Sequence, residues 1–202
     1  MGNRRAVIVA SGPSARGFVP PPDVPVIAVN GAGVWLPRLD YWFSLDASQA
    51  NRAYLRTAAG RGAQCHIAGQ PWLLHASCVR IATYWSRVDS LHTYDEPQPR
   101  GTPEWWLWRL GAVLGICKQP GHIHTGNSAW GALGLAWHLG FRDVALIGVD
   151  ATSEPRVEGG CSNDLSHLPL LFASALPDMR VVSCGALNSI PQSTFKEWYE
   201  NR

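Results

Sequence analysis

The residue types best suited to binding an anion lie in four short turns of this chain. They are Ser11-Gly12-Pro13-Ser14, Asn30-Gly31, Asp46-Ala47-Ser48 and Thr125-Gly126-Asn127-Ser128. Hydroxyls, amides and free backbone N–H groups donate hydrogen bonds to phosphate oxygens. In the first turn we expect Gly12 to allow close approach of a ligand and Ser14 to donate its hydroxyl. Each turn alone also fits an ordinary connection between elements. The prediction of a nucleotide site depends on all four turns lying at the carboxyl edge of the predicted sheet.

Two further residues add acid–base chemistry to this site. Asp150 directly follows the apolar run 144–149, and His167 lies in the polar stretch after it. Imidazole titrates near neutral pH without a special environment, so His167 is the candidate general acid or base. A cap or surface position is the simpler role for this histidine, and it stays open.

The remaining histidines and cysteines do not indicate a metal site. His122 and His124 would face the same side of a strand, but no third ligand has a fixed spacing. The five cysteines form an odd set without a CxxC pair, which argues against zinc and against a disulfide framework. We expect buried free thiols and no certain cofactor.

Three of the ten tryptophans, Trp105, Trp106 and Trp108, fall in one polar, proline-flanked segment. We expect a tryptophan-rich loop or lid inserted at about residues 85–120. The cluster fits a hydrophobic clamp or an oligomer contact. It equally fits a stacking surface for a base, a sugar ring or an acceptor.

The elements that must position these residues alternate between apolar strands and helices. Strands are predicted over 5–10, 24–29, 41–45, 63–68, 79–84, 144–149 and 179–184, and helices over 49–60, 105–114, 127–139, 167–175 and 193–199. This alternation predicts one α/β domain over residues 1–202, Rossmann-like, with a mostly parallel central sheet flanked by helices. The turns then meet at the carboxyl edge of the sheet, where such folds bind ligands.

Residues 124–150 form a complete half-unit of such a fold. The helix predicted over 127–139 carries Ala129, Leu133, Ala136 and Trp137 on one stripe, which should pack on the sheet. Gly140 is a natural helix stop, and the next strand ends at Asp150. The segment therefore predicts both a fold and a wall of the site.

Composition and missing motifs narrow the function classes. The formal charge of +2 does not indicate nucleic acid or a membrane surface as partner. No apolar run approaches the roughly 20 residues of a membrane span, and the apolar start is too short for a secretory signal, so we expect a cytoplasmic protein. Neither GxGxxG nor GxxxxGK[ST] occurs, which argues against a dinucleotide cofactor and a P-loop.

The turns together with Leu-Ala-Trp-His-Leu-Gly-Phe-Arg-Asp-Val-Ala-Leu-Ile-Gly-Val-Asp150 resemble two related groups. One is the bacterial sialyltransferases of glycosyltransferase family 42. The other is the domain shared with archaeal 6-hydroxymethylpterin diphosphokinases and with phage proteins. The resemblance is strongest over 120–150. It implies that Gly12, Pro13, Ser14 and Asn30 hold the nucleotide, that Thr125, Gly126, Asn127 and Ser128 hold the donor, and that His167 is the general base.

Three functions follow as expectations. The first is a transferase that uses a nucleotide or nucleotide-sugar donor, glycosyltransferase-like, with an unknown acceptor. The second is a diphosphokinase in which Asp46 and Asp150 bind Mg²⁺ between phosphates. The third is a non-catalytic protein that sequesters a nucleotide or contacts a partner, and a homo-oligomer fits any of the three.

Overall fold

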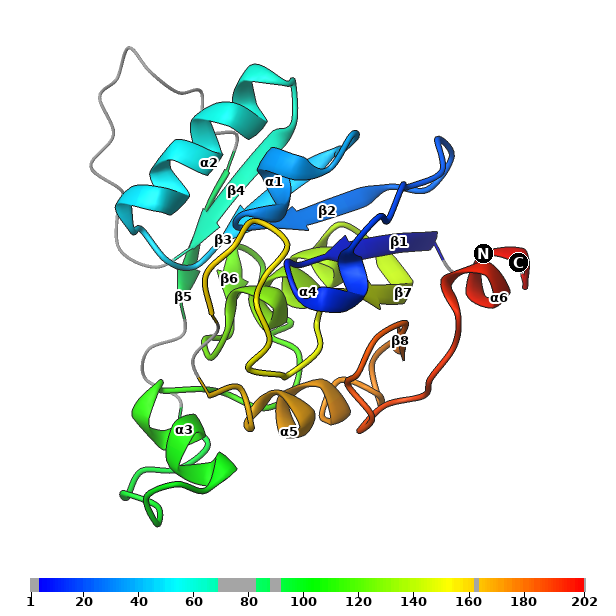
Figure 1. Ribbon diagram of the computed structural model, residues 1–202. Helices are drawn as coiled ribbons and strands as arrows, with labels where there is room; N and C mark the ends of the chain where they lie inside the picture. The colour runs from blue at the N-terminus through cyan, green and yellow to red at the C-terminus, as the bar shows by residue number, and fades with distance from the viewer. Residues whose placement is uncertain (1–3, 69–82, 88–91, 162–163, 202) are drawn as a thin grey trace.

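The computed structural model describes residues 4–68, 83–87, 92–161 and 164–201, and its centre is an eight-stranded parallel sheet (Figure 1). The order of strands across the sheet is β6-β5-β4-β3-β2-β1-β7-β8. The strands are β1 (Arg4–Val9), β2 (Val26–Val29), β3 (Tyr41–Ser44), β4 (Gln64–Ala68), β5 (Thr83–Arg87), β6 (His122–Ile123), β7 (Phe141–Ile147) and β8 (Arg180–Ser183). The expected α/β, Rossmann-like fold is confirmed, and neighbouring strands pair in parallel throughout the described residues.

Helices cover both faces of this sheet. They are α1 (Ala32–Trp35), α2 (Gln49–Gly60), α3 (Pro103–Arg109), α4 (Ser128–His138), α5 (Leu168–Ala173) and α6 (Phe195–Glu200), with a short 3-10 turn at Pro13–Ala15. One core cluster joins the sheet to α4 and α5, and the other joins its opposite face to α1, α2 and α6. Figure 1 shows α1 and α2 toward the top of the view and α5 near the bottom, with the central strands between them.

Central strands are apolar on both faces because both faces are covered. In β1, Ile8 belongs to one core cluster, whereas Val7 and Val9 belong to the other. Continuous apolar runs of this kind are typical of parallel sheets, and they explain why the strands could be recognised without a polar–apolar alternation.

The chain order creates a switch point beside β1. From β1 the chain builds β2 to β6 on one side, and it then returns through α4 to place β7 on the other side of β1. The connections after β1 and β7 therefore leave the same edge of the sheet in different directions. A crevice between them is the usual ligand site of such folds.

Several element boundaries differ from the expectations. Helix α3 begins at Pro103, because Thr102 caps it by accepting a hydrogen bond from the Trp105 amide, and it ends at Arg109 rather than 114. Strand β7 begins at Phe141, three residues before the predicted start. Strand β5 runs to Arg87, whereas the first four residues of the strand predicted over 79–84 lie outside the described residues.

Helix α4 is more deeply buried than a one-sided stripe would require. All nine residues from Ser128 to Ala136 are buried, since α4 lies between the sheet and α5. Gly131 permits this packing, because a Cβ there would lie 2.7 Å from the Phe43 ring. The expected contact of Ala129, Leu133 and Ala136 with the core is confirmed, but the helix has little polar face.

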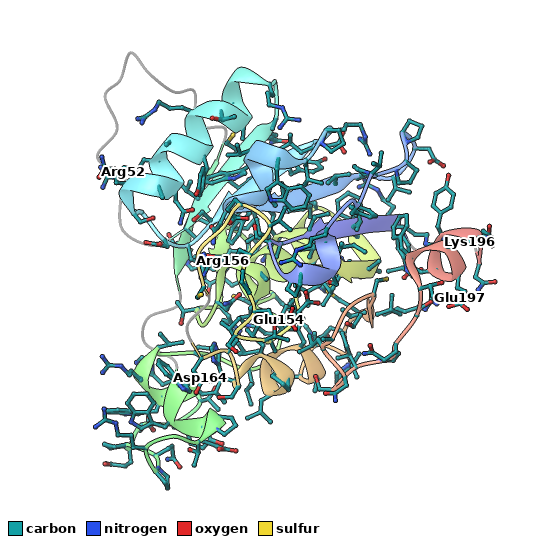
Figure 2. All side chains as sticks on the ribbon, in the orientation of Figure 1. Arg52, Glu154, Arg156, Asp164, Lys196 and Glu197 are labelled. Atoms are coloured by element: carbon teal, nitrogen blue, oxygen red, sulfur yellow. The ribbon has the colours of Figure 1, made fainter. Side chains whose placement is uncertain are left out.

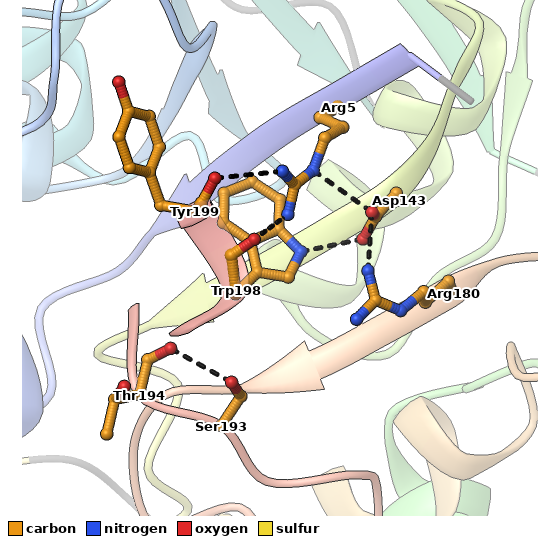
Figure 3. Close-up of polar contacts among 7 residues, drawn as sticks. All are labelled: Arg5, Asp143, Arg180, Ser193, Thr194, Trp198 and Tyr199. Atoms are coloured by element: carbon orange, nitrogen blue, oxygen red, sulfur yellow. Dashed lines mark hydrogen bonds and ion pairs between the residues drawn. The ribbon is translucent and has the colours of Figure 1, made fainter. Parts of the chain in front are cut away.

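An ion-pair cluster fastens the last helix to the amino ends of the strands (Figure 3). Asp143 in β7 pairs with Arg5 of β1 at 3.1 Å and with Arg180 of β8 at 2.7 Å. Its other oxygen accepts a hydrogen bond from Trp198 Nε1 at 2.7 Å, and the Arg5 guanidinium lies 3.9 Å from the Trp198 ring centroid. The edge opposite the crevice is thereby closed by α6.

The thiols are more varied than expected. Cys65 and Cys117 are buried and free, as predicted, whereas Cys161 is exposed and Cys184 is half-buried. Cys161 lies in the polar, glycine-rich segment 152–166, which the sequence predicts as a loop, so the expectation of a buried thiol is wrong there. Burial raises the pKa of Cys65 to about 11. Across the described ranges, no helix is both long and apolar enough to cross a membrane.

A buried histidine should make stability depend on pH. His66 is buried, accepts a hydrogen bond from Trp85 Nε1 through Nδ1, and its pKa is lowered by burial to about 4. The unfolded chain binds a proton there below about pH 6.5, which the folded chain does not bind until about pH 4. The free energy of unfolding should therefore decrease as the pH is lowered from about 6.5 to about 4, by on the order of 1 kcal/mol per pH unit.

Urea unfolding at pH 7.5, 6 and 5 measures this dependence. His66→Asn keeps an acceptor for Trp85 and should flatten the decline, whereas the same change at the exposed His92 should leave it unaltered. An equal decline in His66→Asn and the unsubstituted protein would contradict the assignment.

Candidate functional site

A cavity of about 660 Å³, counting the open space at its mouth, lies at the switch point between β1 and β7. Its walls come from the turn after β1, the end of β2, the start of α4 and the loop after β7. The lining residues are Ala10, Ser11, Gly12, Pro13, Val29, Asn30, Asn127, Ser128, Ala129, Gly148, Val149, Asp150, Ala151, Thr152, Glu154, Arg156, Glu158, Leu165 and Leu168. The predicted turns after β1 and β2 and before α4 thus contribute to one site.

Asp150 joins three connections at the back of this cavity. Its Oδ1 accepts hydrogen bonds from Ser14 Oγ at 2.6 Å and from the Ala186 amide at 3.1 Å, and its Oδ2 accepts one from the Ser14 amide at 2.8 Å. The Ser14 hydroxyl in turn accepts a hydrogen bond from the Gly148 amide at 2.9 Å. We call this set, Ser14, Gly148, Asp150 and Ala186, the Asp150 clasp.

Two glycines are required for the clasp to close. Gly148 has a φ of +70°, and a Cβ there would lie 2.3 Å from the Ala10 carbonyl oxygen. A Cβ on Gly12 would lie 2.5 Å from Asp150 Oδ2 and 2.6 Å from the Gly148 carbonyl oxygen. Since backbone cannot move aside cheaply, these two positions exclude larger residues. The sequence predicted that Gly12 allows a ligand to approach closely. In the structure, the group that approaches Gly12 is the Asp150 carboxylate.

Asn30 is held in a left-handed conformation at the end of β2, with a φ of +49°. Its amide donates to the Phe43 carbonyl at 3.1 Å, and its own carbonyl accepts from Trp42 Nε1 at 2.8 Å. These bonds fix the backbone, while the buried side-chain Oδ1 has no partner within the described chain. Ala151, also on the cavity wall, has a φ of +50°. Such strain is often retained where a ligand binds.

Unpaired hydroxyls also line the wall. The Oγ of Ser11 and the Oγ1 of Thr152 are buried without a partner among the described residues. A buried polar group without a hydrogen bond costs about 1–3 kcal/mol, so such groups mark places where water or a polar ligand binds.

Helix α4 brings its first residues to the cavity. The Asn127 Oδ1 caps the helix by accepting from the Ala129 amide at 2.8 Å, which leaves the side-chain NH₂ to donate elsewhere. The Ser128 Oγ accepts from the Leu45 amide at 3.3 Å and keeps its own proton. Donors therefore dominate this end of the cavity, as anion binding at a helix start requires.

Thr125 and Gly126 support this turn from behind. The buried Thr125 hydroxyl donates to the Gly111 carbonyl. Gly126 has a φ of +136°, and a Cβ there would lie 3.0 Å from Ala112 Cβ and 3.2 Å from Leu171 Cδ1. Neither residue is on the cavity lining, so they position the wall rather than form it.

His167 lies just behind the cavity lining, between Leu165 and Leu168. Its side chain is buried with neither ring nitrogen hydrogen-bonded to a described residue, and its ring centroid lies 6.4 Å from that of Trp106. Burial lowers its pKa, while the Gly126 backbone and the Asp164 carboxylate oppose that shift more weakly. The neutral ring is therefore favoured near pH 7, which suits proton acceptance.

Asp46 does not reach the cavity. Its side chain accepts hydrogen bonds from the Ser48 amide at 3.0 Å and from Asn51 Nδ2 at 3.1 Å, and so organises the start of α2. Because Asp150 is already occupied by three donors, the two carboxylates do not form the predicted Mg²⁺ pair. Across the described ranges, no group of three or more His, Cys, Asp or Glu side chains could hold a metal ion.

The polar, glycine-rich composition of residues 152–166 predicts a loop over the crevice, but the sequence alone did not single out the charged residues of this loop. Glu154, Arg156 and Glu158 alternate along the loop after β7, and all three line the cavity. Figure 2 shows Glu154 and Arg156 on this loop and Asp164 close to α3. The alternation of acidic and basic residues in a loop that follows a strand end could have identified these three residues as part of the site.

Gly31 is the remaining predicted residue. It caps α1, with a φ of −59°, and a Cβ there would lie 2.1 Å from Glu158 Oε1. The end of β2 is thus covered by a carboxylate from the loop after β7.

Comparison with known proteins supports the fold. No protein-family model matches the chain, and no curated protein matches it in sequence. The solved structure of the MAf glycosyltransferase from Magnetospirillum magneticum AMB-1 is similar over 99% of this chain, with a TM-score of 0.55 and 15% identity. The match covers 34% of that protein, so this chain spans about a third of its length. The shared feature is the α/β, Rossmann-like fold.

Removing the hydroxyl of the clasp should destabilise the protein. Ser14→Ala takes one donor from Asp150 and leaves the Gly148 amide without its acceptor, at a cost of about 1–2 kcal/mol in the free energy of unfolding. Chemical denaturation measures this change. Ser153→Ala, an exposed serine of the neighbouring loop, is the matched control and should shift stability by less than about 0.5 kcal/mol. Equal stabilities of the two variants would contradict the clasp.

Proposed function

We propose that this protein binds a nucleotide or nucleotide sugar in the switch-point cavity and transfers a group, most directly a glycosyl group, to an acceptor. The observation that carries the proposal is the cavity itself, in which unpaired hydroxyls and the start of α4 gather donors at the carboxyl edge of the sheet. A phosphate needs such donors, and the crevice outside a switch point is where α/β sheets bind nucleotides.

The fold agrees with this choice of reaction. The similar MAf protein is described as a glycosyltransferase. The sequence resemblance to the bacterial sialyltransferases of glycosyltransferase family 42 points to the same class. Both likenesses support glycosyl transfer without naming the donor or the acceptor.

The proposed chemistry is a displacement at the anomeric carbon of the donor. His167 takes the proton of an acceptor hydroxyl, the acceptor oxygen forms a bond to the anomeric carbon, and the bond from that carbon to the phosphate oxygen breaks. Asn127, Ser128 and Ser11 would then donate hydrogen bonds to the departing phosphate. Asp150 stays in the clasp and holds the turn that carries Ser11 and Gly12.

The diphosphokinase is not favoured by this geometry. That reaction needs carboxylates free to share Mg²⁺ between phosphates. Asp46 faces α2, and Asp150 is engaged by Ser14 and Ala186.

Nucleotide binding is tested by thermal shift with cytidine, uridine, adenosine and guanosine diphosphates, their sugar conjugates and ATP, each with and without Mg²⁺. We expect metal-independent stabilisation by at least one nucleotide sugar, since the donors belong to the chain. Asn127→Ala should weaken binding about tenfold or more by removing donors. Stabilisation that requires Mg²⁺ and ATP would favour the diphosphokinase, and no stabilisation by any nucleotide would overturn the proposal.

Turnover tests the general base. His167→Gln should abolish transfer from the nucleotide sugar that binds, because His167 takes the proton of the acceptor. The dissociation constant of the nucleotide sugar should change less than about threefold, because the proposed donors to its phosphate are other residues. His92→Gln, an exposed histidine, should transfer at the normal rate. Normal transfer by His167→Gln would remove this residue from the mechanism. Binding without transfer to any acceptor would instead support a sequestering role.

A further inference from the structure

We propose that Glu158 is the residue that recognises the ribose of the bound nucleotide, by accepting hydrogen bonds from its vicinal hydroxyls. The inference rests on the proposed function, because it assigns an orientation to the nucleotide in the same cavity. It goes beyond that function by naming the specificity-determining residue and the part of the ligand that it contacts.

The placement of Glu158 is the first support. Its carboxylate lies directly over Gly31, at the end of β2, where a Cβ would come within 2.1 Å of Oε1. The residue lines the cavity, and none of the described residues forms an ion pair or hydrogen bond with its carboxylate. A carboxylate with two free oxygens at a cavity wall is ready to accept hydrogen bonds from a ligand.

The loop that carries Glu158 is fastened to the wall it faces. The Val157 amide donates to the Ser11 carbonyl at 2.9 Å, which ties the loop to the turn after β1. Next to it, the Gly159 amide donates to the Arg156 carbonyl and the Arg156 amide donates to the Gly160 carbonyl, each at 3.0 Å. These bonds close a tight turn with Glu158 inside it, so its backbone is held over the cavity.

The cavity has opposite hydrogen-bonding character at its two ends. Near α4 the side chains of Asn127 and Ser128 have protons to donate. Near the end of β2 the groups are acceptors, namely the Glu158 carboxylate and the unpaired Asn30 Oδ1. Phosphate carries acceptors and negative charge, so it belongs at the α4 end, away from Glu158.

The end of β2 therefore needs an uncharged group that donates hydrogen bonds. A ribose offers two adjacent hydroxyls, which match the two oxygens of one carboxylate. Acidic side chains recognise ribose hydroxyls in other nucleotide-binding α/β folds. In this chain the acid reaches the end of β2 from the loop after β7, and Gly31 leaves the space that it occupies.

Isothermal titration with a ribonucleoside diphosphate and its 2′-deoxy counterpart tests the assignment. The base is the one that stabilises the protein most in the thermal screen. We expect the ribonucleotide to bind about 10- to 100-fold more tightly than the deoxynucleotide, the range of a hydrogen bond to a charged group. Glu158→Ala should reduce this ratio to within about threefold. The Glu158 side chain is exposed and forms no hydrogen bond or ion pair with the described residues, so the variant should fold normally.

Two further variants make the result specific. Gly31→Ala should reduce the ratio as well, since its φ of −59° suits alanine and the new methyl group displaces the flexible Glu158 side chain. Glu154→Ala removes the same charge from the same cavity wall, and it should change the affinities for both nucleotides by the same factor.

The outcomes separate this inference from the proposed function. Equal affinity of the unsubstituted protein for the two nucleotides, or an undiminished ratio in Glu158→Ala, would overturn the role of Glu158 while nucleotide binding stands. Failure of every nucleotide to bind the unsubstituted protein would overturn the proposed function, and the ribose contact with it. Loss of the ratio in Glu154→Ala alone would transfer the role to Glu154 and contradict the assignment.

Discussion

The arrangement of the candidate site depends on one buried carboxylate. Asp150 accepts three hydrogen bonds, two from Ser14 and one from Ala186, and thereby joins the connections that follow β1, β7 and β8. These connections would otherwise diverge, because the chain changes direction at the switch point. Gly12 and Gly148 have no Cβ to interfere with the clasp. The Asp150 carboxylate therefore holds the cavity wall together with hydrogen bonds from the chain itself. The groups available to a ligand are the other polar atoms of the cavity wall.

The polar residues of the site therefore fall into two groups. One group stabilises the structure of the site, and the other has atoms available to bind a ligand. Asp150, Thr125 and Asp46 have partners from the chain itself. The Ser11 hydroxyl and Asn30 Oδ1 have none within the described residues and lie on the cavity. The groups available to a ligand are thus the polar atoms that the chain itself leaves without a partner, and not the side chains already engaged within it. At the opposite edge of the sheet the Asp143 cluster closes the fold around α6, which leaves the carboxyl edge as the open one.

The sequence predicted the architecture well, because buried parallel strands and capped helices leave local signals. Helix α2 spans the predicted residues 49–60, with Ser48 as its cap. The start of β7 was missed, because Arg142 and Asp143 are polar and the partners of Asp143 come from distant parts of the chain. For the same reason the sequence located Asp150 but not its three donors, and it overlooked Glu158, whose relevance arises from a loop folded back over β2. Contacts between segments far apart in the chain decide such roles.

The central claim is that a nucleotide binds at the switch point held together by the Asp150 clasp. Hydrogen–deuterium exchange, measured with each of the four ribonucleoside diphosphates, tests it most directly because it reports where a ligand protects the backbone. We expect at least one nucleotide to slow exchange together in residues 10–13, 127–129 and 148–152, which line the cavity. Unchanged exchange in these three segments with all four nucleotides, or protection confined to α3, would contradict the account.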